Sequence, residues 1–199
     1  MTGESDGAEP VRVVIAEDEA IIRLDLKELL QEEEYDVVGE TGRGDEAVEL
    51  VRDLRPDLVI LDIKMPGLDG LSAAREIAGE RLAAVLMVTA FSQRELVEQA
   101  RDAGALAYLV KPFQKSDLVP ALELAYARHR ELQALGSEVR SLEERLESRK
   151  LIDRAKGRLM DANGLTEAEA FSFIQKRAMN ERVRMRDVAQ LVIDGELAP

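Results

Sequence analysis

Residues 58–70 read LVILDIKMPGLDG, and this stretch decides the fold. Its four consecutive apolar residues, Leu58 to Leu61, are typical of a strand that is covered on both faces. The strand ends in a carboxylate, Asp62, and Pro66-Gly67 then fits a tight turn. The sequence therefore predicts a buried strand that delivers Asp62 to the edge of a sheet, where other groups must meet it.

Other short apolar runs flank this strand. They span residues 11–16, 35–40, 83–89 and 106–110. Amphipathic helical patterns lie between the runs, and in the first of these Leu26 and Leu30 share one face. Strands that alternate with short helices predict a parallel sheet between two layers of helices. We therefore predict for residues 11–127 an α/β, flavodoxin-like fold with five parallel strands in the order 2-1-3-4-5.

Polar side chains follow several of these strands at the same edge of the sheet. Glu17 and Asp18 follow the first strand, Thr89 ends the fourth, and Lys111 follows the fifth. In this fold class, ligands bind beyond the carboxyl ends of the strands. We therefore expect these groups to gather around Asp62.

Carboxylates gathered in this way need a cation. Two of them within about 4 Å repel each other by roughly 4 kcal/mol at an effective dielectric constant of about 20. A cluster of oxygen ligands without His or Cys suits Mg²⁺. An Asp carboxylate can also attack phosphorus, and Mg²⁺ with Lys111 would oppose the charge of the phosphoryl oxygens. The residues therefore predict a site that forms an aspartyl phosphate.

Four stretches resemble the receiver domain of two-component response regulators. They are VVIAEDE at 13–19, LVILDIKMPGLDG at 58–70, MVTAF at 87–91 and AYLVKPF at 107–113. The resemblance implies that Asp62 is the phosphoacceptor, that a sensor histidine kinase phosphorylates it, and that Mg²⁺ is the cofactor.

The resemblance also assigns roles to the surrounding residues. It implies as metal ligands the side chains of Glu17, Asp18 and Asp62 and the backbone carbonyl of Lys64. It implies that Thr89 and Tyr108 form the switch pair and that Lys111 contacts the phosphate. It further implies a cis bond between Lys111 and Pro112. Without the resemblance, Tyr108 in a central strand is predicted to be part of the core.

Residues 116–147 are predicted to form a long helix that leaves this domain. Apolar residues recur in it with the spacing of a coiled-coil seam, at Leu132, Leu135, Val139, Leu142 and Leu146. Two alternatives remain open: the seam packs inside the chain against the C-terminal segment, or it forms a homodimer through residues 132–146. His129, which is flanked by Arg128 and Arg130, is predicted to be a solvated surface residue.

From Arg149 onward, the pattern predicts three short helices and no strand. The helices cover about 149–162, a segment that opens with a capping box at Thr166, and about 184–194. Ten Lys or Arg and five Asp or Glu lie between Arg149 and Arg186, although the whole chain has a net charge of −13. A local excess of basic residues is compatible with nucleic-acid binding, but a solvated charged face has the same composition.

Residues 137–195 resemble an ANTAR domain, the three-helix RNA-binding module of transcription antitermination regulators. The resemblance is carried by AKGRLM at 155–160, Glu169-Ala170-Phe171, Ala178-Met179 and Val188-Ala189. It implies that the domain binds mRNA hairpin loops and prevents transcription termination. Phe171 is predicted to be buried, whereas Phe173 either stacks on a base or packs against the long helix.

The candidate RNA contacts are the basic residues of this region and one glycine. They are Arg149, Lys150, Arg154, Lys156, Gly157, Lys176, Arg177, Arg182 and Arg184. Gly157 is unusual inside a helix unless another molecule approaches closely. Lys156 beside it would present a charge to a phosphate.

Composition and the remaining motifs limit the class of protein. The chain of 199 residues has no Cys and no apolar run of the roughly 20 residues that span a bilayer, so we expect a cytoplasmic protein without membrane contact. Residues 1–10 are predicted to be a flexible tail. No second catalytic constellation accompanies Asp62, which favours a regulator over an enzyme. The alternative outputs are DNA binding through a helix-turn-helix and protein interaction without nucleic acid.

Overall fold

The computed structural model describes residues 9–90 and 93–198. Most of the predicted N-terminal tail at 1–10, and Phe91 of the MVTAF motif, lie outside the described residues. The chain divides into two compact units, with the boundary between Gln133 and Ala134. No helix among the described residues is long and apolar enough to cross a membrane.

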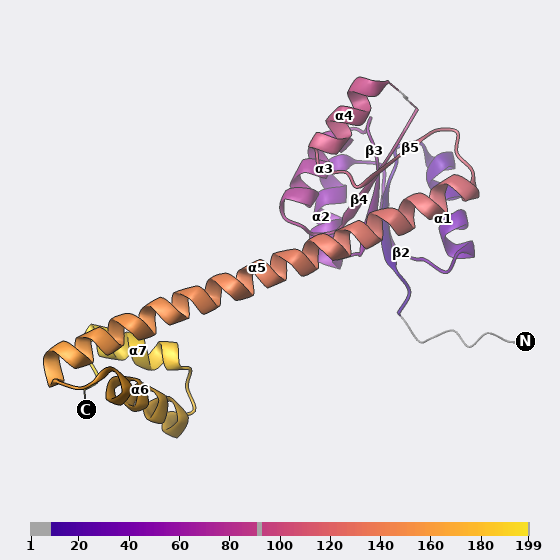
Figure 1. Cartoon of the computed structure of the whole chain (residues 1–199). Helices are drawn as coiled ribbons and strands as arrows, with labels where there is room; N and C mark the ends of the chain where they lie inside the picture. Colours follow the sequence, from indigo (N-terminus) through magenta and orange to yellow (C-terminus); the bar gives the residue numbers. More distant parts are fainter. Residues whose placement is uncertain (1–8, 91–92, 199) are drawn as a thin grey trace, which may run out of the picture. The chain divides into compact units, whose positions relative to one another are not determined.

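The first unit is built on a five-stranded parallel sheet (Figure 1). Its strands are β1 (Arg12–Ala16), β2 (Asp36–Thr41), β3 (Leu58–Asp62), β4 (Ala84–Thr89) and β5 (Ala107–Val110). They are arranged in the order β2-β1-β3-β4-β5, with every neighbouring pair parallel. The predicted fold class and strand order are therefore confirmed.

Helices cover both faces of this sheet. They are α1 (Ala20–Glu32), α2 (Gly44–Leu54), α3 (Gly70–Gly79), α4 (Arg94–Asp102) and the first part of α5 (Lys115–Asn163). Side chains of α2, α3 and α4 pack in one core, and those of α1 and α5 pack in the other. Figure 1 shows α2, α3 and α4 on one side of the sheet and α1 on the other. Alternate residues of β3 serve the two cores, with Val59 in the first and Ile60 in the second. All of β3 is buried, which explains its unbroken apolar run.

Helix α5 buries one stripe against the sheet, and this stripe corrects the prediction for His129. Leu118, Leu122, Ala125 and His129 follow each other at intervals of four, three and four residues, which places them on one helical face. His129 is only 8% exposed, and its Nε2 lies 2.7 Å from Nε2 of Gln133. The flanking Arg128 and Arg130 are exposed, as expected for residues on other sides of a helix. The prediction that His129 is solvated was wrong because it relied on sequence neighbours and not on helical spacing.

Helix α5 continues without interruption to Asn163, so the separate helix predicted at about 149–162 is in fact its last part. Its sequence is rich in strong helix formers, and Asn163-Gly164 provides the first effective stop. The five seam residues Leu132, Leu135, Val139, Leu142 and Leu146 are 52–59% exposed. The alternative in which they pack against the C-terminal segment is therefore not observed in the described chain.

The second unit combines the last part of α5 with α6 (Glu167–Glu181) and α7 (Met185–Asp194). The predicted capping box opens α6: the Thr166 side chain accepts from the backbone of Glu169, and the Glu169 side chain accepts from the backbone of Thr166. Half of the buried core residues are alanines, which allows close helix packing. The buried residues are Ala155, Leu159, Ala170, Ile174, Ala178, Val188, Ala189 and Val192. Phe173 packs against this core.

Phe171 does not belong to this core. Its side chain lies at a surface position and is 41% exposed. The prediction that Phe171 is buried was therefore wrong. The neighbouring positions Ala170 and Ile174 carry the buried face of α6 instead.

Candidate functional site

Sheet topology brings the predicted acidic residues together. Strands β1 and β3 are neighbours and Ala16 pairs with Leu61, so the residues that follow these positions lie side by side. One carboxylate oxygen each from Glu17, Asp18 and Asp62 lies within 4.8 Å of the other two. Three acids from separate parts of the sequence thus form one cluster.

Lys111 reaches the same cluster from the end of β5. Its Nζ lies 2.6 Å from Oε2 of Glu17 and 3.1 Å from Oδ1 of Asp62, and its side chain is only 11% exposed. The bond between Lys111 and Pro112 is cis, as expected. The backbone N–H of Lys111 donates to the carbonyl of Thr89 at 2.7 Å, which ties this loop to the end of β4.

The buried charges shift each other's pKa values. Burial raises the pKa of Glu17, and the charge of Asp62 adds to this effect while Lys111 opposes it. Burial alone would lower the pKa of Lys111, but its bonds to Glu17 and Asp62 outweigh burial and raise it. Lys111 therefore remains a cation that offsets part of the acidic charge.

The donor set fits a hard divalent cation. Apart from the ion pair with Lys111, the buried Oε2 of Glu17 has no hydrogen-bond partner among the described residues. All candidate ligands are oxygens, and three carboxylates against one lysine leave an excess of negative charge. A cation at this place would offset the excess negative charge, and the carboxylate oxygens are ligands of the kind that it prefers.

The loop after Asp62 holds the carboxylate in place. Its Oδ2 accepts from the backbone N–H of Lys64 at 2.9 Å, and the N–H of Gly70 donates to the carbonyl of Ile63 at 2.9 Å. A Cβ atom on Gly70 would lie only 1.8 Å from the carbonyl oxygen of Asp62, so this position requires glycine. Asp69 then caps α3 by accepting from the N–H of Ser72.

Thr89 and Tyr108 lie next to this cluster on β4 and β5. Thr89 is buried at the end of β4, and Tyr108 is half-buried against the core that contains α3 and α4. Burial raises the pKa of the Tyr108 hydroxyl, a hydrogen bond with the Thr89 side chain opposes this, and the charge of Asp62 raises it further. Tyr108 is therefore both partly a core residue and electrostatically coupled to Asp62.

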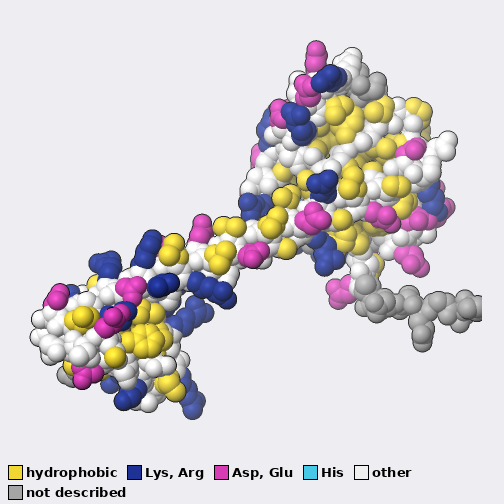
Figure 2. Space-filling view, in the orientation of Figure 1, with side chains coloured by type: hydrophobic (Ala, Val, Ile, Leu, Met, Phe, Trp, Pro, Cys, Tyr) yellow, Lys and Arg dark blue, Asp and Glu magenta, His cyan; other side chains and the backbone are white. Residues whose placement is uncertain are grey.

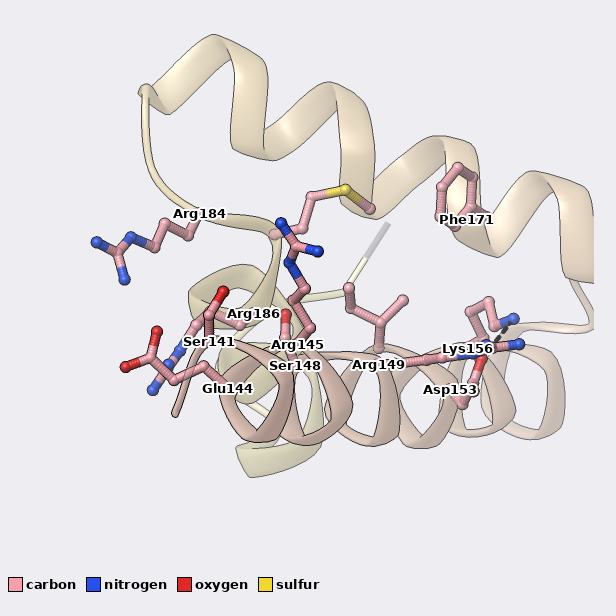
Figure 3. A pocket seen from close by; sticks show the side chains of 12 residues that line it. Ser141, Glu144, Arg145, Ser148, Arg149, Asp153, Lys156, Phe171, Arg184 and Arg186 are labelled. Atoms are coloured by element: carbon pink, nitrogen blue, oxygen red, sulfur yellow. Dashed lines mark ion pairs between the residues drawn. The ribbon is translucent and has the colours of Figure 1, made fainter. Parts of the chain in front are cut away.

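The C-terminal unit contains an open groove of about 560 Å³ lined by α5, α6 and the start of α7 (Figure 3). Three predicted RNA contacts line it, namely Arg149, Lys156 and Arg184. The other candidates lie outside its lining, and they are Lys150, Arg154, Gly157, Lys176, Arg177 and Arg182. On the face of this unit that Figure 2 shows, hydrophobic side chains lie among Lys, Arg, Asp and Glu side chains.

Comparison with known proteins identifies both parts of the chain. Residues 13–123 match the response regulator receiver domain, and residues 140–193 match the ANTAR domain. The chain is 58% identical to the transcriptional regulatory protein PdtaR of Mycobacterium tuberculosis over 197 residues, which cover 98% of this chain and 96% of that protein. The chain is a response regulator with an ANTAR output domain.

Other relatives resemble the receiver domain alone. The chemotaxis protein CheY of Thermotoga maritima is 41% identical over 112 residues, which cover 56% of this chain and 93% of CheY. A solved DNA-binding response regulator of the LuxR family from Staphylococcus aureus has a TM-score of 0.56 and 30% identity, and covers 58% of this chain and 98% of its own. A chain in the CheX–CheY–BeF₃–Mg²⁺ complex from Borrelia burgdorferi matches with a TM-score of 0.54 and 26% identity. The match covers 56% of this chain and 86% of that chain.

Within the ANTAR domain, the sequence-based list missed two residues of the groove. Arg145 and Arg186 line it, and Arg145 lies before Arg149, where the basic segment considered in the sequence begins. Arg186 lies within the basic segment and could have been included on its charge alone. Lys156 is held by Asp153 at 2.8 Å and Glu167 at 2.7 Å, so part of its charge is already compensated.

Proposed function

We propose that a sensor histidine kinase phosphorylates this response regulator on Asp62 and that its ANTAR domain binds hairpin loops in nascent mRNA and prevents transcription termination. The observation that carries the proposal is the meeting of Glu17, Asp18, Asp62 and Lys111 at one sheet edge. The proposed RNA binding is supported by the match of residues 140–193 to the ANTAR domain.

In the phosphoryl transfer, a carboxylate oxygen of Asp62 attacks the phosphorus of the kinase's phosphohistidine. An O–P bond forms while the N–P bond breaks, and the imidazole nitrogen leaves with the electron pair. Glu17, Asp18, Asp62 and the carbonyl of Lys64 would hold Mg²⁺, which supplies positive charge opposite the phosphoryl oxygens. Lys111, which already lies 3.1 Å from Asp62, supplies a second positive charge.

Thr89 and Tyr108 are proposed to transmit the change. A phosphoryl group on Asp62 adds negative charge and acceptor oxygens beside the Thr89 hydroxyl. Movement of Thr89 toward that group would break its hydrogen bond with Tyr108, so the half-buried ring could adopt another orientation. The side chains of these two residues thus couple the site to the surface formed by β4 and β5.

The exposed seam at residues 132–146 supports a homodimer of the long helix. Its apolar residues have the spacing of a coiled coil, and within this chain each remains more than half exposed. A second copy that presents the same seam would bury them. Sedimentation of the full chain with and without beryllofluoride and Mg²⁺ tests this step, and a monomer in both conditions would exclude it.

DNA binding is the weaker of the alternative outputs. A recognition helix presents a polar and basic face to the major groove. The last helix, α7, instead carries Asp187 in its first turn and ends at Asp194. The match to the ANTAR domain also favours RNA.

Crosslinking in cells tests the proposed function. The full chain and its Asp62→Ala variant are crosslinked to RNA, purified under denaturing conditions and sequenced with the attached transcripts. We expect the wild-type protein to retain transcripts with hairpins upstream of terminators, and the variant to retain fewer. Absence of RNA, together with a gel shift on duplex DNA, would establish the DNA-binding alternative.

A further inference from the structure

The groove of the C-terminal unit combines an exposed aromatic ring with positive charge. Phe171 projects from α6 toward α5, and Arg149 and Lys156 lie on the facing side of α5 (Figure 3). Arg145 also lines the groove from α5. Its volume of about 560 Å³ lies within the range of roughly 300–1,000 Å³ that is common for ligand sites.

The side chain of Phe171 does not contribute to the core between the three helices. The core of the unit consists of Leu159, Ile174 and smaller residues, and Phe173 is one of several partly buried residues that pack against it. Phe171 is 41% exposed and is not a member of that core. An exposed aromatic ring at the wall of a groove offers a flat apolar face to a planar partner.

The charges around the ring favour an anion. Lys156 is compensated by two carboxylates, and Nε of Arg186 lies 3.7 Å from Asp187. The guanidinium groups of Arg145, Arg149 and Arg184 have no ion pair within 4.0 Å among the residues that the structure describes, and Figure 3 draws none for them. The groove is also lined by Glu144 and Asp153, and the charge of Arg149 helps to lower the pKa of Asp153. Five basic and two acidic side chains therefore border a groove that contains an aromatic face.

We propose that this groove binds an unpaired nucleotide of the RNA, with the base stacked on Phe171 and the adjoining phosphates on Arg145, Arg149 and Arg184. The inference rests on the proposed function and assigns RNA binding to one place on the domain. Proteins that bind single strands combine an aromatic stacking surface with a basic groove along the backbone. A base pair inside a stem cannot stack on Phe171, because the neighbouring base pairs cover both of its faces.

A Phe171→Trp variant gives a direct test, because the natural chain contains no Trp. The probe is a set of RNA hairpins with randomised loops that the full-length wild-type chain retains in the presence of beryllofluoride and Mg²⁺. Stacking on a base is expected to quench the indole fluorescence when these hairpins are added. A long RNA duplex, in which only the two terminal base pairs expose a face, is expected to quench it far less. Hairpins that bind without quenching would contradict the proposed stacking.

Affinity measurements on the full-length chain separate stacking from charge. Phe171→Ala is expected to weaken hairpin binding about tenfold to a hundredfold, while Phe171→Tyr keeps most of the affinity. Arg145→Gln is expected to lower the slope of log affinity against log salt concentration by about 0.7. The matched controls lie outside the groove: Arg140→Gln on α5 for an exposed charge and Met179→Ala on α6 for an exposed apolar side chain. Circular dichroism checks that every variant is folded.

The outcomes distinguish the two proposals. If the wild-type chain retains no hairpin, RNA binding is excluded, and the proposal that the groove binds RNA is excluded as well. If the wild-type chain binds hairpins but the Phe171 and Arg145 variants bind as the controls do, RNA binding stands and the groove is not its site. Binding of an acidic peptide with the same loss in the Phe171 and Arg145 variants, and no RNA binding, would assign the groove to a protein partner.

Discussion

The acidic pocket of the receiver and the basic groove of the ANTAR domain use charge in opposite ways. In the pocket, Glu17, Asp62 and Lys111 are buried or nearly buried and contact one another. In the groove, Arg145 and Arg149 remain without an ion pair among the described residues. This charge distribution supports the proposed metal ion and phosphoryl group in the pocket and the proposed larger anionic partner in the groove. A buried charge needs a partner within the fold because its desolvation is costly, whereas an exposed charge is solvated by water until a ligand binds.

Substitution of Asp62 has the largest expected effect, and it separates the two regions. Asp62→Asn keeps the side chain's shape but removes the nucleophilic carboxylate, so phosphorylation is expected to be lost completely. The groove does not contain Asp62, so the RNA affinity should remain at the level of the unphosphorylated wild-type chain. Incorporation of phosphate from a phosphorylated kinase, followed by mass spectrometry, checks the first part. A variant that still accepts phosphate would place the acceptor elsewhere.

Removal of one cation from each region tests whether their charges differ in structural importance. Lys111→Met leaves Glu17 and Asp62 without their buried partner, and we expect it to destabilise the receiver by about 1–3 kcal/mol in the absence of divalent ions. Arg145→Gln removes an exposed cation without an ion pair and should change stability by less than about 0.5 kcal/mol. Urea unfolding of both variants measures the difference.

Metal removal extends the same comparison. Because Mg²⁺ would replace part of the charge that Lys111 supplies, it should stabilise the Lys111→Met variant more than the wild-type receiver. Addition of EDTA should reverse this gain. Equal effects of Mg²⁺ on the wild-type chain and on an Asp18→Asn variant would show that the ion binds outside the pocket.

Substitution of a glycine by alanine is expected to have opposite effects on stability in the two regions. A Cβ on Gly157 meets nothing within 4 Å, whereas one on Gly70 would clash with the carbonyl of Asp62. Gly157→Ala should therefore stabilise α5 by about 0.5–1 kcal/mol, because alanine loses less backbone entropy in a helix. Gly70→Ala should destabilise the receiver. Since Gly157 does not line the groove, its substitution should leave hairpin affinity unchanged, and a marked loss would extend the RNA site to this position.

The smallest expected effect concerns pH. Burial lowers the pKa of His129, and the charge of Asp57 partly opposes this. Because the unfolded chain binds the proton more tightly, the receiver should have its full stability above a pH of about 6.5 and lose some of it as the pH falls through the lowered pKa of the folded state. His129→Gln should flatten this part of the profile, which urea unfolding from pH 7.5 to 5 can measure. An unchanged profile would show that His129 does not cause it.

The same contrast explains what the sequence could predict. The receiver fold and the convergence of Glu17, Asp18, Asp62 and Lys111 follow from strand order, because the carboxyl ends of parallel strands share one edge. The exposure of Phe171 and the groove lining by Arg145 depend on how three helices rotate against each other, and the periodicity of one helix does not determine this. The prediction for His129 was wrong for a different reason: it relied on the neighbouring arginines, whereas its spacing from Leu122 and Ala125 places His129 on the buried stripe of α5.

RNA affinity of the full chain in its two phosphorylation states tests the central claim most directly. The hairpin affinity of the wild-type chain is measured with and without beryllofluoride and Mg²⁺, beside that of Asp62→Asn under the same conditions. The account predicts that beryllofluoride changes the affinity of the wild-type chain and leaves that of Asp62→Asn unaltered. Equal affinity of the wild-type chain in both states, or the same response in Asp62→Asn, would contradict control of the ANTAR domain by phosphorylation of Asp62.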